Sequence, residues 1–286
     1  MTPTLVRRHL SHADSPPRVN MGARARDWSE IQERMLVPLY ETVHERLEVG
    51  PATRLLGLRC GSGLALLMAA ARGAAVTGVD SCPERLALAR ERLLPDPARS
   101  ARARGRSARI VEGAPRDAAV GQAPAYDLIT AFDPIGCQAG DAEELGDLLA
   151  EATPLAEHGA AVVLAGWGPP ERCATSSVLR VAAKLADPLR SAGSWRPACR
   201  DDLEEVAQRA GLRIDGSGRV SCPFGYADTD SAVRGLLSTG LFDTGIAAAG
   251  EEQVGKELAE ALHAHLRPDG TVWMPNVFRY LIARVY

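Results

Sequence analysis

The sequence predicts an α/β protein built on a mainly parallel β-sheet. Short apolar runs of strand length alternate with helical segments, at a spacing typical of β-α-β units. A glycine-containing turn follows the first of these runs, and an acidic residue ends the second. Because crossovers between parallel strands are right-handed, such units fix most of the topology. The chain of 286 residues suffices for one large domain, or for a core domain with a smaller cap.

The elements of the first half follow from hydrophobic periodicity and from turn residues. Apolar residues recur at helical spacing over 28–47, and Gly50 and Pro51 end that helix. Pro83 suits the first position of a helix, because its fixed φ is already helical. We expect strands over 54–58, 75–79, 109–112, 126–132 and 160–166, and helices over 64–71, from residue 83 onward and over 141–157.

The second half is less regular. Residues 200–210 predict an amphipathic helix closed by Gly211. We expect a loose extension over 1–25 and one domain over 26–286. Within it, residues 50–167 would bind a cofactor, residues 168–270 would form a cap that takes the substrate, and 277–285 would return to the sheet. The further helices are expected over 175–186, 231–237 and 251–266, with strand character over 213–222 and a last strand over 277–285.

The composition argues against several classes of partner. A net charge of −3 offers no overall attraction to nucleic acid or to an acidic membrane. No apolar run approaches the roughly 20 residues that cross a bilayer, and the N-terminus lacks the apolar region of a secretory signal. The six cysteines are scattered, which predicts reduced thiols, no metal site and no disulfide framework. We expect a cytoplasmic protein, and the predominance of arginine over lysine indicates a bacterial source with a GC-rich genome.

A glycine turn after the first strand is the main functional signal. Gly61 and Gly63 let the backbone approach a ligand closely, and the next helix presents free N–H groups at its N-terminus. Asp80 ends the second strand about 20 residues beyond the turn, where its carboxylate can accept hydrogen bonds from both ribose hydroxyls. NAD-binding Rossmann domains and methyltransferases share this pattern. The third glycine of G-x-G-x-x-G is absent, which argues against a dinucleotide.

One stretch resembles the cofactor motifs of class I S-adenosylmethionine-dependent methyltransferases: LLGLRCGSGLALLMAAARGAAVTGVDSCPERLALARERL. The family's usual form is an apolar strand, an acid, G-x-G-x-G, a helix and V-x-G-V-D. Two further segments are similar to its fourth strand and to the ending of many bacterial small-molecule members, YDLITAF and PDGTVWMPNVFRYLIARV. The resemblance implies a Rossmann-like fold with a mainly parallel seven-stranded sheet, an antiparallel last strand, helices on both faces and a helical cap. It also implies S-adenosylmethionine as cofactor and a small organic molecule as methyl acceptor.

The resemblance assigns cofactor-binding roles to the glycine turn, two strand ends and the first helix. The turn would face the methionine part of the cofactor, and the second strand end its ribose and adenosine. The end of the fourth strand would border the methyl-transfer site, and the first helix would close the pocket. No catalytic residue follows from it. The residues are, in that order, Gly61, Ser62 and Gly63; Asp80, Ser81 and Cys82; Phe132 and Asp133; and Trp28 and Gln32.

Three positions depart from the family pattern. The family's acid in the first strand corresponds to Gly57, and the first glycine of its turn to Arg59. The acid that often holds the adenine amino group corresponds to Ala114, with Asp117 as a displaced substitute. Arg59 leaves two alternatives open. Pointing inward, it would fill the space of the methionine group; swung outward, it would cost little and could pair with the cofactor carboxylate.

Other features favour structural roles. The arginines between 99 and 109 are expected in a solvated loop, because no aromatic residues interleave with them as on an RNA-binding surface. The sequence Asp133-Pro134-Ile135 is not the motif of base-methylating enzymes, so no nucleic-acid substrate is expected. His44 is expected to be a packing or surface residue, and Cys137 an inert thiol.

Two functions remain open from the sequence. The first is methyl transfer from S-adenosylmethionine to a small acceptor, with proximity and orientation as the main sources of catalysis. The second is a methyltransferase-like protein that has lost cofactor binding and acts as a binding or regulatory module. Gly57, Arg59 and Ala114 motivate the second function.

Overall fold

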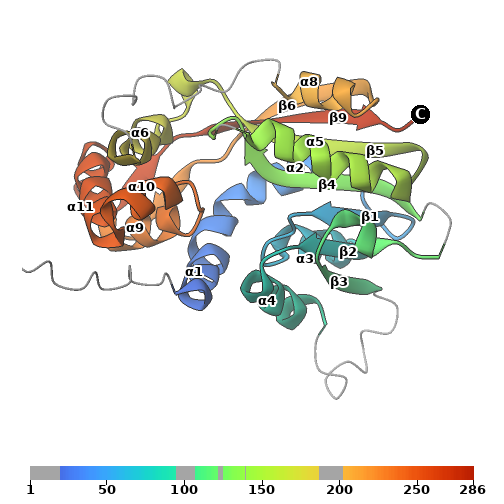
Figure 1. Ribbon diagram of the computed structural model, residues 1–286, viewed down its shortest axis with the longest axis horizontal. Helices are drawn as coiled ribbons and strands as arrows, with labels where there is room; N and C mark the ends of the chain where they lie inside the picture. Colours follow the sequence, from blue (N-terminus) through green and yellow to red (C-terminus); the bar gives the residue numbers. More distant parts are fainter. Residues whose placement is uncertain (1–19, 95–106, 122–124, 139, 187–201) are drawn as a thin grey trace, which may run out of the picture.

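The computed structural model describes residues 20–94, 107–121, 125–138, 140–186 and 202–286. A seven-stranded sheet with the order β3-β2-β1-β4-β5-β9-β6 forms one end of the molecule, and a group of helices forms the other (Figure 1). The arginines at 99, 102, 104 and 106, and Trp195 and Cys199, lie outside the described residues. The strands are β1 (Arg54–Leu58), β2 (Ala75–Asp80), β3 (Ala108–Glu112), β4 (Tyr126–Ile135), β5 (Ala156–Trp167), β6 (Arg213–Ser221) and β9 (Val277–Arg284).

The sheet is parallel except for β9. Strand β1 pairs in parallel with β2 and β4, β2 with β3, and β4 with β5. Strand β9 lies between β5 and β6 and is antiparallel to both. The expected α/β fold, with seven strands, mainly parallel, and an antiparallel last strand, is therefore confirmed.

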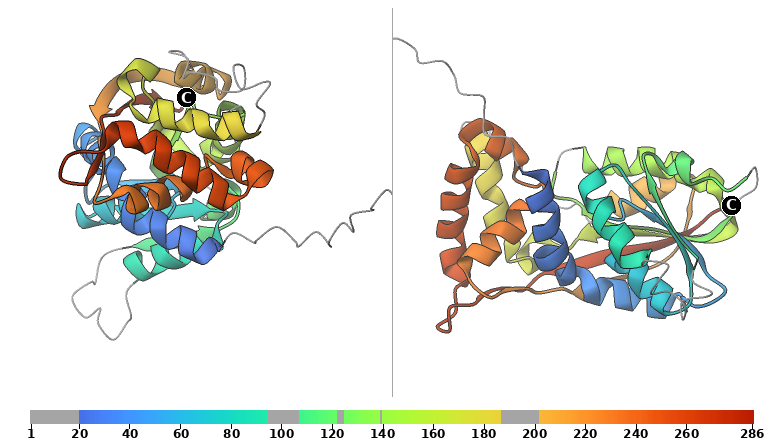
Figure 2. Two further views of the ribbon diagram at one scale, coloured as in Figure 1. Left: turned by 90° about the vertical axis from the view of Figure 1, so that its left-hand side faces the viewer. Right: turned by 90° about the horizontal axis from the view of Figure 1, so that it is seen from below.

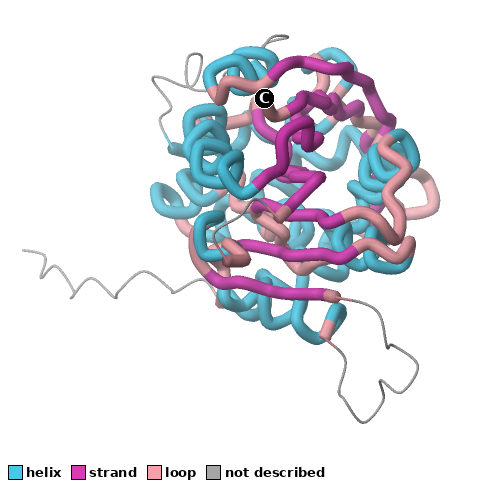
Figure 3. The backbone as a smooth tube through the Cα atoms, turned by 90° about the vertical axis from the view of Figure 1, so that its right-hand side faces the viewer, coloured by secondary structure: helices cyan, strands magenta, loops and turns pink. Residues whose placement is uncertain are grey.

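Both faces of the sheet are covered by helices (Figure 3). On one face, Leu55 and Leu128 pack with residues of α2 (Val37–Arg46) and α3 (Leu64–Ala71). On the other, Leu56 packs with residues of α5 (Asp141–Ala152) and α8 (Asp202–Arg209). Neighbouring residues of one strand thus enter opposite cores, which explains why these strands read as continuous apolar runs.

The helical cap packs on the first of these two cores (Figure 2). Its helices contact one another, and α1 (Met21–Asp27) lies between the cap and α4 (Pro83–Leu93). A two-stranded sheet that the sequence did not predict joins the cap to the ends of the long strands. The cap consists of α6 (Thr175–Ala186), α9 (Thr229–Leu237), α10 (Asp243–Ala249) and α11 (Glu251–Leu262), with β7 (Phe224–Tyr226) and β8 (Val272–Met274).

The N-terminal helix differs from its prediction. It begins at Met21, inside the segment expected to be a loose extension, because the Asn20 side chain caps it by accepting a hydrogen bond from the Ala23 N–H. It is also not one helix over 28–47. A π-helical turn over Trp28–Gln32 and a 3₁₀ turn over Glu33–Leu36 separate α1 from α2.

Two prolines account for the second of these breaks and for the early end of α5. Pro38 cannot donate the hydrogen bond that a continuous helix requires, and its ring clashes with the preceding turn. Helix α5, expected to reach residue 157, ends at Ala152 because Pro154 follows. Helix α10 was not predicted. No helix in the described part of the chain is long and apolar enough to cross a membrane.

Candidate functional site

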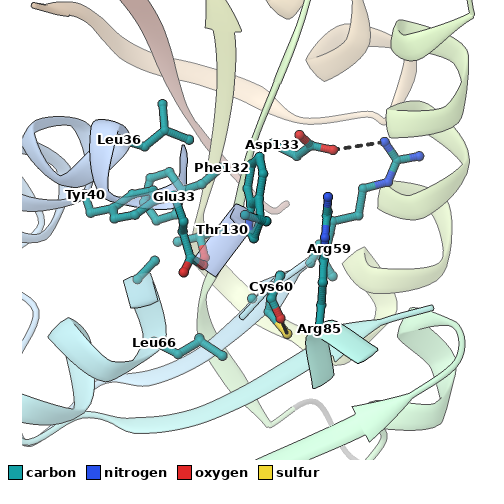
Figure 4. Close-up of a pocket in the computed structure, with 15 residues that line it drawn as sticks. Glu33, Leu36, Tyr40, Arg59, Cys60, Leu66, Arg85, Thr130, Phe132 and Asp133 are labelled. Carbon is teal, nitrogen blue, oxygen red and sulfur yellow. Dashed lines mark hydrogen bonds and ion pairs between the residues drawn. The ribbon is translucent and has the colours of Figure 1, made fainter. Parts of the chain in front are cut away.

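A hollow opens at the carboxyl ends of β1 and β4 (Figure 4). Its floor is the turn after β1, and the segment between α1 and α2 closes it from above. Its free volume is about 30 Å³. The residues that line it include Trp28, Glu33, Leu36, Tyr40, Gly57, Arg59, Gly61, Leu66, Arg85, Thr130, Phe132 and Asp133.

The turn after β1 contains three residues with left-handed backbone conformations. Arg59 has a φ of 47°, Gly61 of 57° and Gly63 of 80°. A β-carbon on Gly61 would lie 3.0 Å from Nε1 of Trp28, and one on Gly63 would lie 3.1 Å from Cβ of Ala89. The two glycines therefore allow the N-terminal segment and α4 to approach the turn closely. Arg59 takes the same type of conformation with a side chain, which costs roughly 1–2 kcal/mol.

Asp80 holds the turn from below. Its side chain is buried, with Oδ2 accepting from the Gly61 N–H at 2.8 Å and Oδ1 from the Cys82 N–H at 2.9 Å. Each carboxylate oxygen keeps a further lone pair. Ser81 is exposed and Cys82 is half-buried directly after it. The expected cluster of turn, Asp80, Ser81 and Cys82 is thus assembled, although only Gly61 of this group borders the hollow.

A buried carboxylate from the N-terminal segment lies on the turn, and the sequence analysis missed it. Glu33 is only 2% exposed. Its Oε1 accepts from the Leu64 N–H at 3.3 Å, and its Oε2 accepts from Arg92 at 2.6 Å and from the Ser62 hydroxyl. The sequence does indicate that Glu33 is buried, because it lies at helical spacing from Leu36 and Tyr40, on the apolar face of the helix.

Trp28 and Gln32 lie on the same segment. The Nε1 of Trp28 is buried without a hydrogen-bond partner among the described residues, and the guanidinium of Arg85 lies 4.4 Å from the indole centre. Gln32 is buried and its Oε1 accepts from the Tyr226 hydroxyl at 2.8 Å. Trp28 therefore faces the hollow, whereas Gln32 ties the segment to the cap.

A second cavity, of about 40 Å³, lies between the hollow and the cap. We call it the aromatic chamber. Trp167, Phe224 and Phe278 form its wall, with ring centroids 4.6–6.0 Å apart. It shares Trp28, Leu36 and Asp133 with the hollow, so the two cavities adjoin. Its residues are Trp28, Gln32, Leu36, Asp133, Pro134, Trp167, Phe224, Thr239, Leu241 and Phe278.

Not all expected site residues come together. Phe132 is buried beside Tyr40, with ring centroids 4.9 Å apart, and Asp133 is exposed at the rim. Asp117 is exposed, and its carboxylate accepts from the Ala114 N–H of its own turn at 2.8 Å. It lines neither the hollow nor the aromatic chamber. Within the described ranges, no group of His, Cys, Asp and Glu gathers as a metal site requires.

The thiols near the site are not set up as nucleophiles. Burial raises the pKa of the Cys60 and Cys137 thiols, so both remain protonated at neutral pH. Burial, together with the charge of Glu33, raises the pKa of Tyr40 as well. Tyr40 therefore stays neutral at neutral pH.

Comparison with known proteins gives matches at the level of the fold. No protein-family model matches the sequence, and no curated protein does. Among solved structures, a provisionally assigned methyltransferase from Bacillus halodurans is 14% identical with a TM-score of 0.52, over 86% of this chain and 97% of that one. YjhP from Escherichia coli is 17% identical with a TM-score of 0.50, over 92% and 99% of the two chains. YcgJ from Bacillus subtilis is 16% identical with a TM-score of 0.50, over 86% and 97%.

The strand order and these matches decide the architecture. The chain has the fold of class I S-adenosylmethionine-dependent methyltransferases. In open sheets of this type, ligands bind outside the carboxyl ends of the strands where the strand order reverses. In this methyltransferase fold that point lies between β1 and β4, where the hollow opens.

Two departures from the methyltransferase pattern have a structural explanation. A β-carbon on Gly57 would lie 2.9 Å from Cδ2 of Leu66, so a side chain at this position of β1 would require the Leu66 side chain of α3 to shift. Arg59 points outward, and its guanidinium lies 3.4 Å from Asp133 (Figure 4). The guanidinium also pairs with Glu144 of α5. Of the two alternatives for Arg59, the structure therefore has the outward one, with the guanidinium across the rim.

Proposed function

We propose that the protein transfers a methyl group from S-adenosylmethionine to a small organic acceptor. The observation that carries this proposal is the position of the glycine turn. Gly61, held by Asp80, borders a hollow at the switch point of the sheet, and the aromatic chamber adjoins that hollow. One cavity can thus take a cofactor while the other takes the molecule that receives the methyl group.

Polar groups of the hollow and of the turn beneath it fit such a cofactor. Asp80 keeps acceptor capacity for ribose hydroxyls, and Trp28 offers a buried N–H without a partner among the described residues. A cofactor needs more room than the hollow now has, and the side chains at its mouth can give it. Arg59 is 35% exposed and is held by surface ion pairs worth about 0–1 kcal/mol, so its movement costs little.

Orientation is what this chain's residues contribute to the reaction. When bound, S-adenosylmethionine supplies an electrophilic methyl group on its sulfonium. The turn and Asp80 would fix the cofactor, while Trp167, Phe224 and Phe278 would hold an apolar acceptor against it. Asp133 lines both cavities, so its carboxylate is placed to take a proton from an acceptor hydroxyl.

A second candidate function rests on the narrowness of the hollow. Its open space of about 30 Å³ and the guanidinium of Arg59 across its rim favour a protein that no longer binds the cofactor. Such a protein would use the aromatic chamber to bind a small apolar ligand without chemistry.

Calorimetric titration with S-adenosylmethionine and S-adenosylhomocysteine separates the two functions. We expect micromolar binding to the wild type and a loss of about tenfold or more in Asp80→Ala, because a charged hydrogen bond to ribose is removed. Asp215→Ala, a change of an exposed carboxylate paired with Arg284 on β9, is the matched control and keeps full affinity. No heat at millimolar ligand, with binding restored in Arg59→Gly, would establish the second function instead.

A further inference from the structure

A buried acceptor and a buried donor face the same glycine of the turn. A β-carbon placed on Gly61 would lie 3.4 Å from Oε1 of Glu33 and 3.0 Å from Nε1 of Trp28. Both groups border the hollow. The Glu33 oxygen has one long contact, the Leu64 N–H at 3.3 Å, and the Trp28 nitrogen has no partner within the described residues. A pair of this kind matches a ligand that carries an ammonium group and a carboxylate side by side.

We propose that Glu33 and Trp28 recognise the amino-acid end of the cofactor, with Glu33 accepting from its ammonium group and Trp28 donating to its carboxylate. The proposal rests on the proposed function, because it concerns the same hollow. Glu33 thus brings a carboxylate to the turn from the N-terminal segment. On strand β1 the corresponding position is Gly57, and the Leu66 side chain occupies the space beside it.

Arg92 fixes the direction of the Glu33 carboxylate. Its guanidinium binds only Oε2 of that carboxylate, and it also bonds the Ser62 carbonyl at 3.0 Å and the Ser29 carbonyl at 3.1 Å. Oε1 is left directed at Gly61 with capacity for a further hydrogen bond. A buried carboxylate with one oxygen fixed and the other open is suited to bind a cation.

The π-helical turn is what brings the two side chains together. In an α-helix, residues five positions apart lie about 140° apart around the axis. Here the Glu33 N–H bonds to the Trp28 carbonyl, five residues earlier, which returns residue 33 to the side of residue 28. Single π turns of this kind are frequent at functional sites.

Two ligands that differ only at the amino-acid end test the proposal. S-adenosylhomocysteine has the ammonium and the carboxylate, whereas 5′-methylthioadenosine keeps the adenosine and the sulfur but lacks both. In calorimetric titrations, Glu33→Gln should weaken S-adenosylhomocysteine about 10- to 100-fold. The affinity of this variant for 5′-methylthioadenosine should stay within about twofold of the wild-type affinity, because Glu33 makes no proposed contact with the adenosine.

Trp28→Phe keeps the experiment decisive if Glu33→Gln fails to fold. It removes the indole N–H, which has no partner in the described structure, together with part of the ring over which the Arg85 guanidinium lies, so thermal unfolding of the ligand-free variant is compared with that of the wild type. We expect about a tenfold loss for S-adenosylhomocysteine and none for 5′-methylthioadenosine. Glu30→Gln is the matched control, because Glu30 lies on the same turn but is exposed.

The outcomes separate this proposal from the proposed function. A wild type that binds neither ligand overturns both. If the wild type binds both ligands, the variants decide the roles of Glu33 and Trp28. Those roles alone are overturned if the variants bind both ligands equally more weakly, bind both as the wild type does, or bind S-adenosylhomocysteine more tightly.

Discussion

Arg59 shows how a single residue can keep the backbone of a turn while changing its chemistry. Its φ of 47° belongs to the conformation that glycine adopts without strain. The side chain leaves the hollow and pairs with Asp133 and Glu144. The cost of the left-handed backbone, roughly 1–2 kcal/mol, is of the same size as the gain from two exposed ion pairs.

This balance gives a prediction for stability. Arg59→Ala loses both ion pairs and keeps the strained β-carbon, whereas Arg59→Gly loses the ion pairs and the strain. We expect the glycine variant to exceed the alanine variant by about 1 kcal/mol in free energy of unfolding, measured by urea denaturation. In the middle of a helix or strand, by contrast, alanine normally gives a higher free energy of unfolding than glycine. An alanine variant equal to or above glycine would show that the turn carries no strain at this position.

His44 is a second residue whose surroundings have a measurable consequence. It is fully buried beside Phe132, and neither ring nitrogen has a partner within the described ranges. Burial, and then the charge of Arg72, lower its pKa from 6.5 to about 4. Between pH 4 and pH 6.5, His44 therefore binds a proton in the unfolded chain but not in the folded protein. The stability contributed by the neutral ring is therefore complete above pH 6.5 and is lost as the pH falls toward 4.

Replacing the ring should remove this pH dependence. Between pH 7 and pH 5 the wild type should lose about 2 kcal/mol in free energy of unfolding through His44 alone. His44→Leu keeps the space filled and has no titrating group, so its loss over the same interval should be smaller by that amount. His158→Gln, a change of an exposed histidine, serves as the control and should follow the wild type. Parallel curves for wild type and His44→Leu would contradict the argument.

At the scale of elements, the sequence correctly predicted those strands and helices that depend on a local pattern of residues. The strands of the parallel sheet read as short apolar runs because both of their faces are buried, as Leu55 and Leu56 illustrate. Helices with clear ends, such as α3 and α6, lie at the predicted bounds. The bounds that moved depend on single prolines or caps. Pro154 shortens α5, and Asn20 starts α1 within residues that composition alone assigned to a loose extension.

The candidate site was predictable in part for the same reason. The turn and Asp80 form one local strand–turn–helix–strand unit, so their arrangement follows from sequence spacing. Glu33 reaches the turn from another element, through contacts that no spacing encodes. Periodicity also cannot foresee a π-helical turn, because one extra residue shifts every later side chain of the helix. Asp117 was expected beside the adenine, but it instead caps its own turn.

At the scale of the whole molecule, the cap and the sheet share one core. Leu258 of α11 belongs to the same buried cluster as Leu55 of β1. Strand β9 joins this cluster to the one on the opposite face, since Ile282 lies in the first and Leu281 in the second. Because this buried cluster continues from the cap to the sheet, the cap is expected to unfold together with the sheet rather than before it.

Two alanine substitutions test this expectation from opposite ends of the molecule. Leu258→Ala opens a cavity in the cap, and Leu149→Ala opens one beneath α5 on the far face; both side chains are fully buried. Each should lower the free energy of unfolding by about 2–5 kcal/mol. In urea denaturation, the fluorescence of Trp28, Trp167 and Trp273 should report on the end of the sheet that meets the cap and on the cap itself, and far-ultraviolet circular dichroism on all helices. Because the core is continuous, both signals should move to the same lower midpoint in each variant. If Leu258→Ala shifted only the fluorescence, the cap would be an independent unit, and its aromatic chamber could open without disturbing the turn that holds Gly61.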